Sequence, residues 1–81
     1  MLPQLATAPK VVGVKQTRRA VQTGAAVTVF VARDAEKRAV SPVLDACEQA
    51  GLTVVWAETM AELGTACGIE VSAAAAAIVN E

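Results

Sequence analysis

Apolar residues change their spacing several times along the chain, from short continuous runs to the spacing of one helix face. This alternation predicts strands and helices in turn, and therefore an α/β sandwich. Val11–Val14 is expected to be a short strand, followed by a helix over residues 15–23 that ends at Gly24. Val27–Ala32 is rich in β-branched residues and predicts a central strand that is covered on both faces.

The second half of the chain continues the alternation after a charged connection over residues 34–40. Ser41 and Pro42 suit the N-cap and the first position of a helix, which would run to Ala50 and stop at Gly51. Apolar residues within this segment lie at helical spacing and would form its buried side.

The last third predicts a strand, a helix and a more ambiguous ending. Residues 53–57 read as a strand, and Thr59 with Glu62 three residues later is a capping-box pair that opens a helix over residues 60–67, closed by Gly68. In residues 72–79 five consecutive alanines favour a helix, whereas the Ala-Ile-Val ending and the number of strands favour a strand. We expect a final strand there.

Length and composition limit the fold to one small domain. At 81 residues the chain has room for a single core, which residues 10–81 are expected to build after a flexible segment over residues 1–9. Hydrophobic residues make up 54% of the sequence and are mostly Ala and Val, with one Phe, one Trp and no Tyr. Small side chains of this kind predict helices and strands that pack closely together.

Neither a membrane span nor a secretory signal is apparent in the sequence. The longest apolar stretch, residues 73–79, is seven residues long, against the ~20 that a membrane-spanning helix needs. Residues 1–9 contain no basic residue and no long apolar run, unlike a signal peptide. Cys47 and Cys67 are interpreted as buried, reduced side chains, so we expect a soluble, monomeric protein of the cytoplasm.

Charge is divided unevenly between the two halves of the chain. All seven basic residues lie within residues 1–40, which also hold two acids and carry a net charge of +5. Residues 41–81 contain six acids and no basic residue, for a net charge of −6. Such asymmetry is typical of a one-sided anion binder, although solvated faces that happen to be sorted in sequence would look the same.

The sequence lacks the residues on which most catalytic mechanisms depend. It contains no histidine, the commonest general base and metal ligand. Cys47 and Cys67 stand apart with no further ligands beside them, so neither zinc nor another cofactor is expected. The five glycines are expected at turns and element ends rather than in a phosphate-binding loop, and an enzyme is not expected.

Gly13–Arg19 is the segment that suggests a function. It is expected to join a strand end to the first turns of a helix carrying Lys15, Gln16, Arg18 and Arg19. Cations at a helix N-terminus oppose the helix dipole, so their clustering makes sense if an anion is bound there. Arg, Lys and Gln side chains can also bond the edges of bases. A solvated basic helix face is the alternative interpretation.

The shortage of aromatic residues narrows the mode of nucleic-acid binding. Single-strand binders stack bases on aromatic side chains, but Phe30 and Trp56 lie in predicted strands and are expected in the core. The remaining mode of nucleic-acid binding is a helix that enters a groove of the nucleic acid. Since the major groove of A-form RNA is too deep and narrow for a helix, the target should be RNA with a widened, distorted groove, or DNA.

Two stretches resemble a known family. They are Val12-Gly-Val-Lys-Gln-Thr-Arg-Arg-Ala20 and Leu63-Gly-Thr-Ala-Cys-Gly-Ile-Glu-Val71, the second followed by an Ala-rich Ile-Val ending. Together they are similar to the kink-turn RNA-binding proteins of the L-seven-Ae ribosomal protein superfamily, and most of all to its bacterial YbxF-like branch. The resemblance covers residues 10–80 and implies a three-layer α/β/α sandwich with a small four-stranded mixed sheet.

The resemblance also implies a partner and a set of contacts. Lys15, Gln16 and Arg19 would read the sheared G·A pairs of a kink-turn, and the segment over residues 68–71 would contact its bulge. Thr65 stands where the bacterial branch often has Lys, which removes one expected phosphate contact. The candidate RNA-binding residues are Gly13, Val14, Lys15, Gln16, Arg18, Arg19, Arg33, Lys37, Ile69, Glu70 and Val71.

The expected partner is thus a structured RNA that contains a kink-turn, and the ribosome is a further candidate. No cofactor is expected. The alternative is a protein-interaction module of the same fold, or a ribosome-associated protein without kink-turn specificity. In that case the acidic second half of the chain would supply the contact surface.

Overall fold

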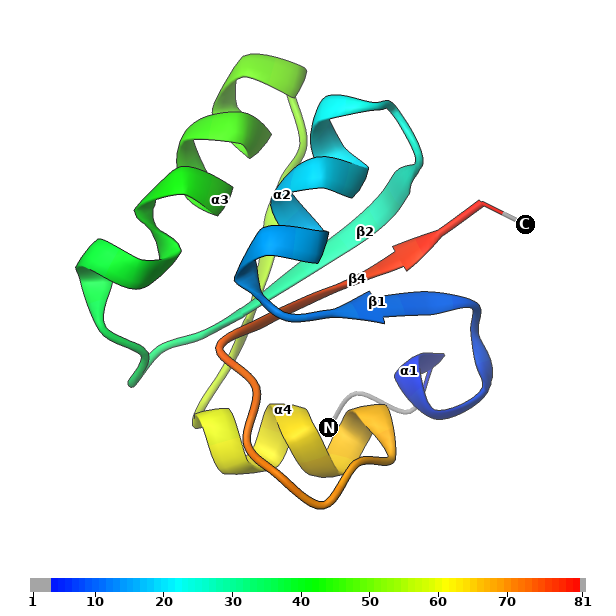
Figure 1. The fold of residues 1–81 in the computed structure, drawn as a ribbon, viewed down its shortest axis with the longest axis vertical. Helices are drawn as coiled ribbons and strands as arrows, with labels where there is room; N and C mark the ends of the chain where they lie inside the picture. The colour runs from blue at the N-terminus through cyan, green and yellow to red at the C-terminus, as the bar shows by residue number, and fades with distance from the viewer. Residues whose placement is uncertain (1–3, 81) are drawn as a thin grey trace.

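A computed structural model describes residues 4–80, and this part of the chain contains four helices and four strands (Figure 1). The predicted order of strands and helices over residues 10–79 is confirmed, including the strand at the end. The elements are α1 (Gln4–Thr7), β1 (Lys10–Val12), α2 (Val14–Gln22), β2 (Ala26–Ala32), α3 (Lys37–Ala50), β3 (Val54–Ala57), α4 (Met60–Cys67) and β4 (Ala75–Val79).

The four strands form one mixed sheet in the order β1-β4-β2-β3. β4 runs antiparallel to both of its neighbours, with Ala76 opposite Val12 of β1 and opposite Phe30 of β2. β2 and β3 run parallel, with Val31 opposite Trp56. β4 and β2 are therefore the inner strands of the sheet, and β1 and β3 are its edges.

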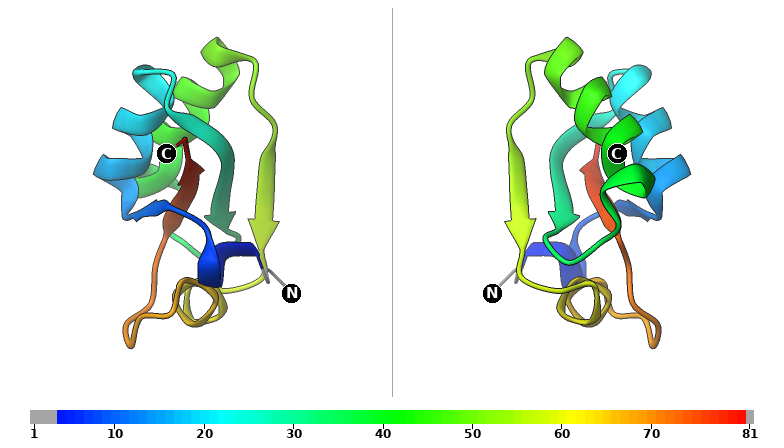
Figure 2. Two further views of the ribbon diagram at one scale, coloured as in Figure 1. Left: turned by 90° about the vertical axis from the view of Figure 1, so that its right-hand side faces the viewer. Right: turned by 90° about the vertical axis from the view of Figure 1, so that its left-hand side faces the viewer.

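Helices pack on both faces of this sheet (Figure 2). On one face α2 and α3 enclose a core that includes Val29 and Val31 of β2. On the other face α1 and α4 cover Phe30 and Ala32 of the same strand. Successive residues of a strand point to opposite faces, so β2 contributes to both cores. The expected three-layer α/β/α sandwich is confirmed.

Helix α3 begins earlier than the sequence predicted. The predicted helix opened at Ser41 and Pro42, but α3 starts at Lys37 and Pro42 lies inside it. Val40 supplies the reason, because it is only 3% exposed and shares its helix face with the buried Val43 three residues later. The additional turn therefore buries an apolar side chain that a charged connection would have left in water.

The N-terminal segment contributes to the core. Residues 1–9 were expected to be flexible; residues 1–3 lie outside the described part of the chain, but Gln4–Thr7 form a helical turn. Leu5 in this turn is fully buried in the core shared with Leu63 of α4. The sequence analysis missed this contact because so short a segment does not establish a helical period.

Trp56 corrects a second expectation. Phe30 is buried as predicted, with 2% of its surface exposed, but Trp56 is 40% exposed. The prediction that Trp56 belongs to the core was wrong because β3 is an edge strand with a neighbour on one side only. Val55, on the opposite face of the same strand, is also 38% exposed.

Candidate nucleic-acid interface

Helix α2 begins at a glycine whose backbone conformation disfavours other residues. Gly13 joins β1 directly to α2 with φ 112° and ψ 153°. Its N–H donates to the carbonyl oxygen of Ala75 at 2.8 Å, and its carbonyl oxygen accepts from the N–H of Thr17 at 2.9 Å. Among residues 4–80 no side chain caps the helix at this end, so none of them occupies the N–H groups of its first turn.

Polar side chains project from the first two turns of α2. The first turn contains no acid that would complement the positive end of the helix dipole. Thr17 faces inward instead and is fully buried, and within the described residues its hydroxyl has no hydrogen-bond partner. The sequence analysis did not identify Thr17, since a threonine among charged residues reads as exposed. The exposed side chains are Lys15, Gln16, Arg18 and Arg19.

Cationic side chains of α2 and α3 lie around a shared hollow. A hollow of about 680 Å³ between the two helices is lined by Arg18, Lys37 and Arg38, with Asp45 as its one acid. A smaller hollow along α2 is lined by Lys15 and Arg18, among others. Within residues 4–80 none of these four cations forms an ion pair. The structure therefore brings the predicted site residue Lys37 together with Arg18.

The second predicted segment follows α4. Gly68 ends this helix in the left-handed conformation with φ 81°, and the N–H of Ile69 donates to the carbonyl oxygen of Gly64 at 3.1 Å. Ile69 is half-buried against the core around α4, whereas Glu70 is exposed and Val71 is 69% exposed. Of the two apolar residues proposed to meet RNA, Val71 is thus the accessible one.

Gly64 corrects the expectation that every glycine lies at a turn or element end. It lies inside α4, where it is buried. A Cβ atom at this position would overlap the carbonyl oxygen of Val71 and would lie 3.0 Å from the Cα of Ser72. The glycine therefore allows the backbone of residues 71–72 to pack directly on the helix, which a glycine within a helical pattern could have indicated.

Strand β4 links the two predicted segments. It begins at Ala75, four residues after Val71, and the Ala75 carbonyl accepts the hydrogen bond from Gly13. In the left view of Figure 2, α2 and the connection from α4 to β4 lie toward the same side of the molecule. The start of α2 and residues 68–71 can therefore face one partner.

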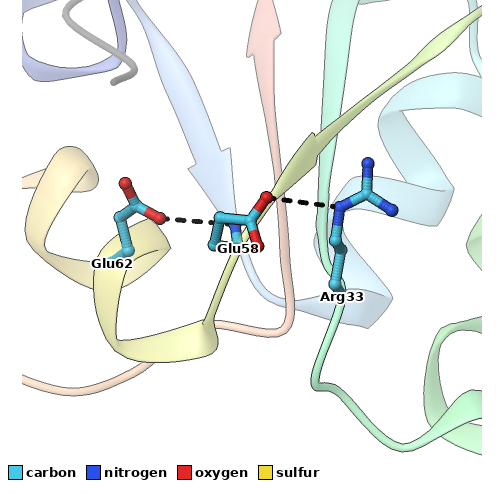
Figure 3. Close-up of polar contacts among 3 residues, drawn as sticks. All are labelled: Arg33, Glu58 and Glu62. Carbon is cyan, nitrogen blue, oxygen red and sulfur yellow. Dashed lines mark hydrogen bonds and ion pairs between the residues drawn. The ribbon is translucent and has the colours of Figure 1, made fainter.

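Arg33 lies in different surroundings from the other predicted residues. Its guanidinium carbon is 5.4 Å from the centre of the Trp56 ring, and its Nε is 3.6 Å from a carboxylate oxygen of Glu58 (Figure 3). It does not line the hollow between α2 and α3. Its partners are thus Trp56 and Glu58.

Both cysteines of the chain are buried. Burial raises the pKa of the Cys47 thiol and, partly opposed by the charge of Lys10, that of the Cys67 thiol. Both side chains are therefore poor nucleophiles. Within residues 4–80 no three acidic or thiol side chains gather as metal ligands, and no helix there has the length and apolar character of a membrane span.

Comparison with known proteins identifies the family of this chain. A model of the ribosomal protein L7Ae/L30e/S12e/Gadd45 family matches residues 3–81. The chain belongs to this family. It is 47% identical over 70 residues to an RNA-binding protein of Caldanaerobacter subterraneus and 44% identical over 70 residues to the RNA-binding protein YbxF of Geobacillus stearothermophilus, covering 86% of this chain and 85% of each relative.

The structural comparison agrees with the sequence comparison. The fold matches that of the 15.5kD RNA binding protein of Giardia lamblia with a TM-score of 0.79, at 28% sequence identity, over 99% of this chain and 68% of the other. The resemblance to the YbxF-like branch that the two sequence stretches suggested is thereby confirmed.

Proposed function

We propose that this L7Ae-family protein is a non-catalytic RNA-binding protein that recognises kink-turns through the start of α2 and through residues 68–71. The observation that carries the proposal is the start of α2, which has no side-chain cap and no acid in its first turn. Exposed side chains at this end carry three cations and an amide. The two sequence relatives and the structural neighbour are RNA-binding proteins by name, which supports the same role here.

The side chains suggest how the contacts are divided. Arg19 and Lys15 can donate to the O6 and N7 acceptors of guanine, and Gln16 offers both a donor and an acceptor to a base edge. The N–H groups of the first turn can hold a phosphate. Val71 supplies apolar contact to an unstacked nucleotide, while the half-buried Ile69 supports the segment from below.

A kinked RNA suits this surface better than a regular duplex. The major groove of A-form RNA is too narrow for a helix end, whereas a kink opens it. A protein that contacts only the kinked form shifts the population of the RNA toward that form by the difference in affinity. We propose that the protein works in this way as a cytoplasmic monomer, with ribosomal RNA as one candidate target.

Arg19→Ala tests the base-reading contact. Loss of a bidentate guanine contact should weaken binding to a kink-turn RNA by about 1–3 kcal/mol, or roughly 5- to 150-fold, with little effect on a duplex whose G·A pairs have been replaced. Lys37→Ala is the matched control, because a residue that touches only phosphate should weaken binding to both RNAs alike and reduce the salt dependence. Titration of labelled RNA measures both effects.

Two results would argue against the proposal. If the wild-type protein bound the kink-turn and the G·A-replaced duplex with equal affinity, kink-turn recognition would be wrong. If Arg19→Ala lost the same factor on both RNAs, Arg19 would be a phosphate contact rather than a reader of bases. The first result would leave a protein-interaction role for the fold.

A further inference from the structure

Trp56 is partly exposed, and packing of the core does not require a tryptophan at this position. It is the only tryptophan of the chain, and 40% of its surface is exposed although it lies in the sheet. Its partner in register is Val31, which is fully buried. An indole of this size normally lies mostly in the core or contacts a partner, because a large part of its area is apolar.

Arg33 lies over the indole and pairs with Glu58 at the ends of two parallel strands. Arg33 is the first residue after β2, and Glu58 is the first after β3. The carboxyl ends of neighbouring parallel strands are the usual place for ligands in open α/β sheets. Figure 3 shows the side chains of Arg33 and Glu58 turned toward each other across these two strand ends.

Arg33 retains most of its bonding capacity. The Nε–carboxylate distance of 3.6 Å to Glu58 makes an ion pair rather than a hydrogen bond, and both side chains are well exposed, at 57% and 78%. Within the described residues no protein group accepts a hydrogen bond from this guanidinium, which offers five N–H donors. The Arg33 guanidinium carbon lies over the Trp56 ring, 5.4 Å from its centre, and both side chains remain partly exposed. A base can therefore stack on this pair.

The local charge indicates what kind of group fits here. Arg33 and Glu58 offset each other, so a bare phosphate gains little, whereas a base has donors and acceptors on its edge for both of them. A base can also stack on an indole or on a guanidinium plane. A second copy of the chain fits less well, because it would bury Glu58 beside Arg33, and Glu is depleted from the centres of protein interfaces.

We propose that Arg33 and Trp56 form a stacking site for an unpaired nucleobase in a single-stranded segment next to the kinked RNA. The site deepens the proposed function, on which it rests, and is separate from the contacts made by α2 and by residues 68–71. It gives the protein a preference for kink-turns with a single-stranded extension over kink-turns with blunt stems.

The test compares RNAs that differ only in the extension. A kink-turn RNA is prepared with blunt stems, with three unpaired nucleotides added to one stem or to the other, and with the same extensions made abasic. Because the chain has one Trp and no Tyr, its emission reports on Trp56 alone, while a label on the RNA reports the affinity. Stacking on an aromatic side chain is worth about 1–3 kcal/mol per base, so one of the extended RNAs should bind roughly 5- to 150-fold more tightly than the blunt RNA and quench the emission.

Variants assign the gain to the site. Trp56→Leu should reduce the advantage of the extended RNA and leave the affinity for the blunt RNA unchanged, whereas Trp56→Phe should retain part of the advantage. Arg33→Ala should reduce the same advantage. The abasic extension should give no advantage, because it keeps the phosphates and lacks the bases. An advantage that survives in Trp56→Leu, or in the abasic RNA, would overturn the proposal.

Two further outcomes would overturn it for other reasons. If Trp56 emission shifted with protein concentration in the absence of RNA, and the protein eluted as a dimer, the exposed indole would be covered by a second copy. If Trp56→Leu lowered the affinity for blunt and extended RNAs alike, the residue would be structural. Adding the same extensions to the duplex with replaced G·A pairs separates this test from kink-turn recognition, since that recognition can fail there while stacking is still measured.

Discussion

Gly64→Ala tests whether the segment after α4 is held by direct backbone packing. In an ordinary helix this change is stabilising, because alanine is favoured over glycine in a helix interior by about 1 kcal/mol. Gly64 is buried in α4 beneath the backbone of Val71 and Ser72. The structure therefore predicts the opposite sign for the change.

The magnitude follows from the space around Gly64. A methyl group there would overlap the carbonyl oxygen of Val71 and would lie 3.0 Å from the Val71 carbonyl carbon and from the Ser72 Cα, whereas carbon atoms in contact usually lie about 3.5–4.0 Å apart. These are backbone atoms, so the whole segment must move. Overpacking of this kind costs about 1–3 kcal/mol, and after the gain of about 1 kcal/mol in helix propensity we expect the free energy of unfolding to fall by up to about 2 kcal/mol.

Urea unfolding followed by circular dichroism measures this change, and the melting temperature should fall by up to roughly 16 °C. Thr65→Ala is the matched control, because Thr65 is the next residue of the same helix and is exposed. It should raise the stability by a few tenths, about 0.5 kcal/mol. If Gly64→Ala stabilised the protein as Thr65→Ala does, the close packing of residues 71–72 on α4 would be refuted.

Three further tests concern the packing of α1, the N-cap of α4 and the two buried cysteines. Leu5→Ala should lower the free energy of unfolding by about 2–5 kcal/mol, since Leu5 is fully buried, and a loss below about 1 kcal/mol in urea unfolding would contradict the packing of α1. Thr59→Ala should cost about 0.5–2 kcal/mol in the same assay and Thr59→Ser much less, because the hydroxyl accepts from the N–H of Glu62. The thiols of Cys47 and Cys67 should react slowly with a thiol reagent at mildly alkaline pH, because burial raises their pKa, and rapidly in urea; equal rates would contradict their burial.

Features that depend on a few neighbouring residues were predictable from the sequence. Both ends of α4 were correct, because Thr59 caps its start at 3.0 Å and Gly68 ends it with φ 81°. One detail differs from the expected capping box: the Glu62 carboxylate accepts from the N–H of Glu58 at 3.3 Å, one residue before the N-cap (Figure 3). The final strand was also correct, although propensity alone favours a helix in an alanine run.

Features that depend on distant residues were not predictable in this way. β4 inserts between β1 and β2, although it is the last strand of the chain, and this order leaves β3 at the edge. The exposure of Trp56 follows from that order and not from its neighbours in sequence, which are apolar. The bond from the Met60 N–H to the Asp34 carboxylate at 2.8 Å, across 26 residues, is likewise invisible in the sequence although it fixes the start of α4 beside the end of β2.

The contacts that hold the candidate interface together are made by backbone atoms rather than by the proposed RNA-binding side chains. Gly13 bonds Ala75 through the main chain, and Gly64 packs against the main chain of residues 71–72. The start of α2 and residues 68–71 are therefore positioned before any RNA arrives, which lowers the ordering cost of binding. Lys15, Gln16 and Arg19 are exposed and are not part of this framework. Substitutions there should therefore change RNA affinity while leaving the free energy of unfolding nearly unchanged.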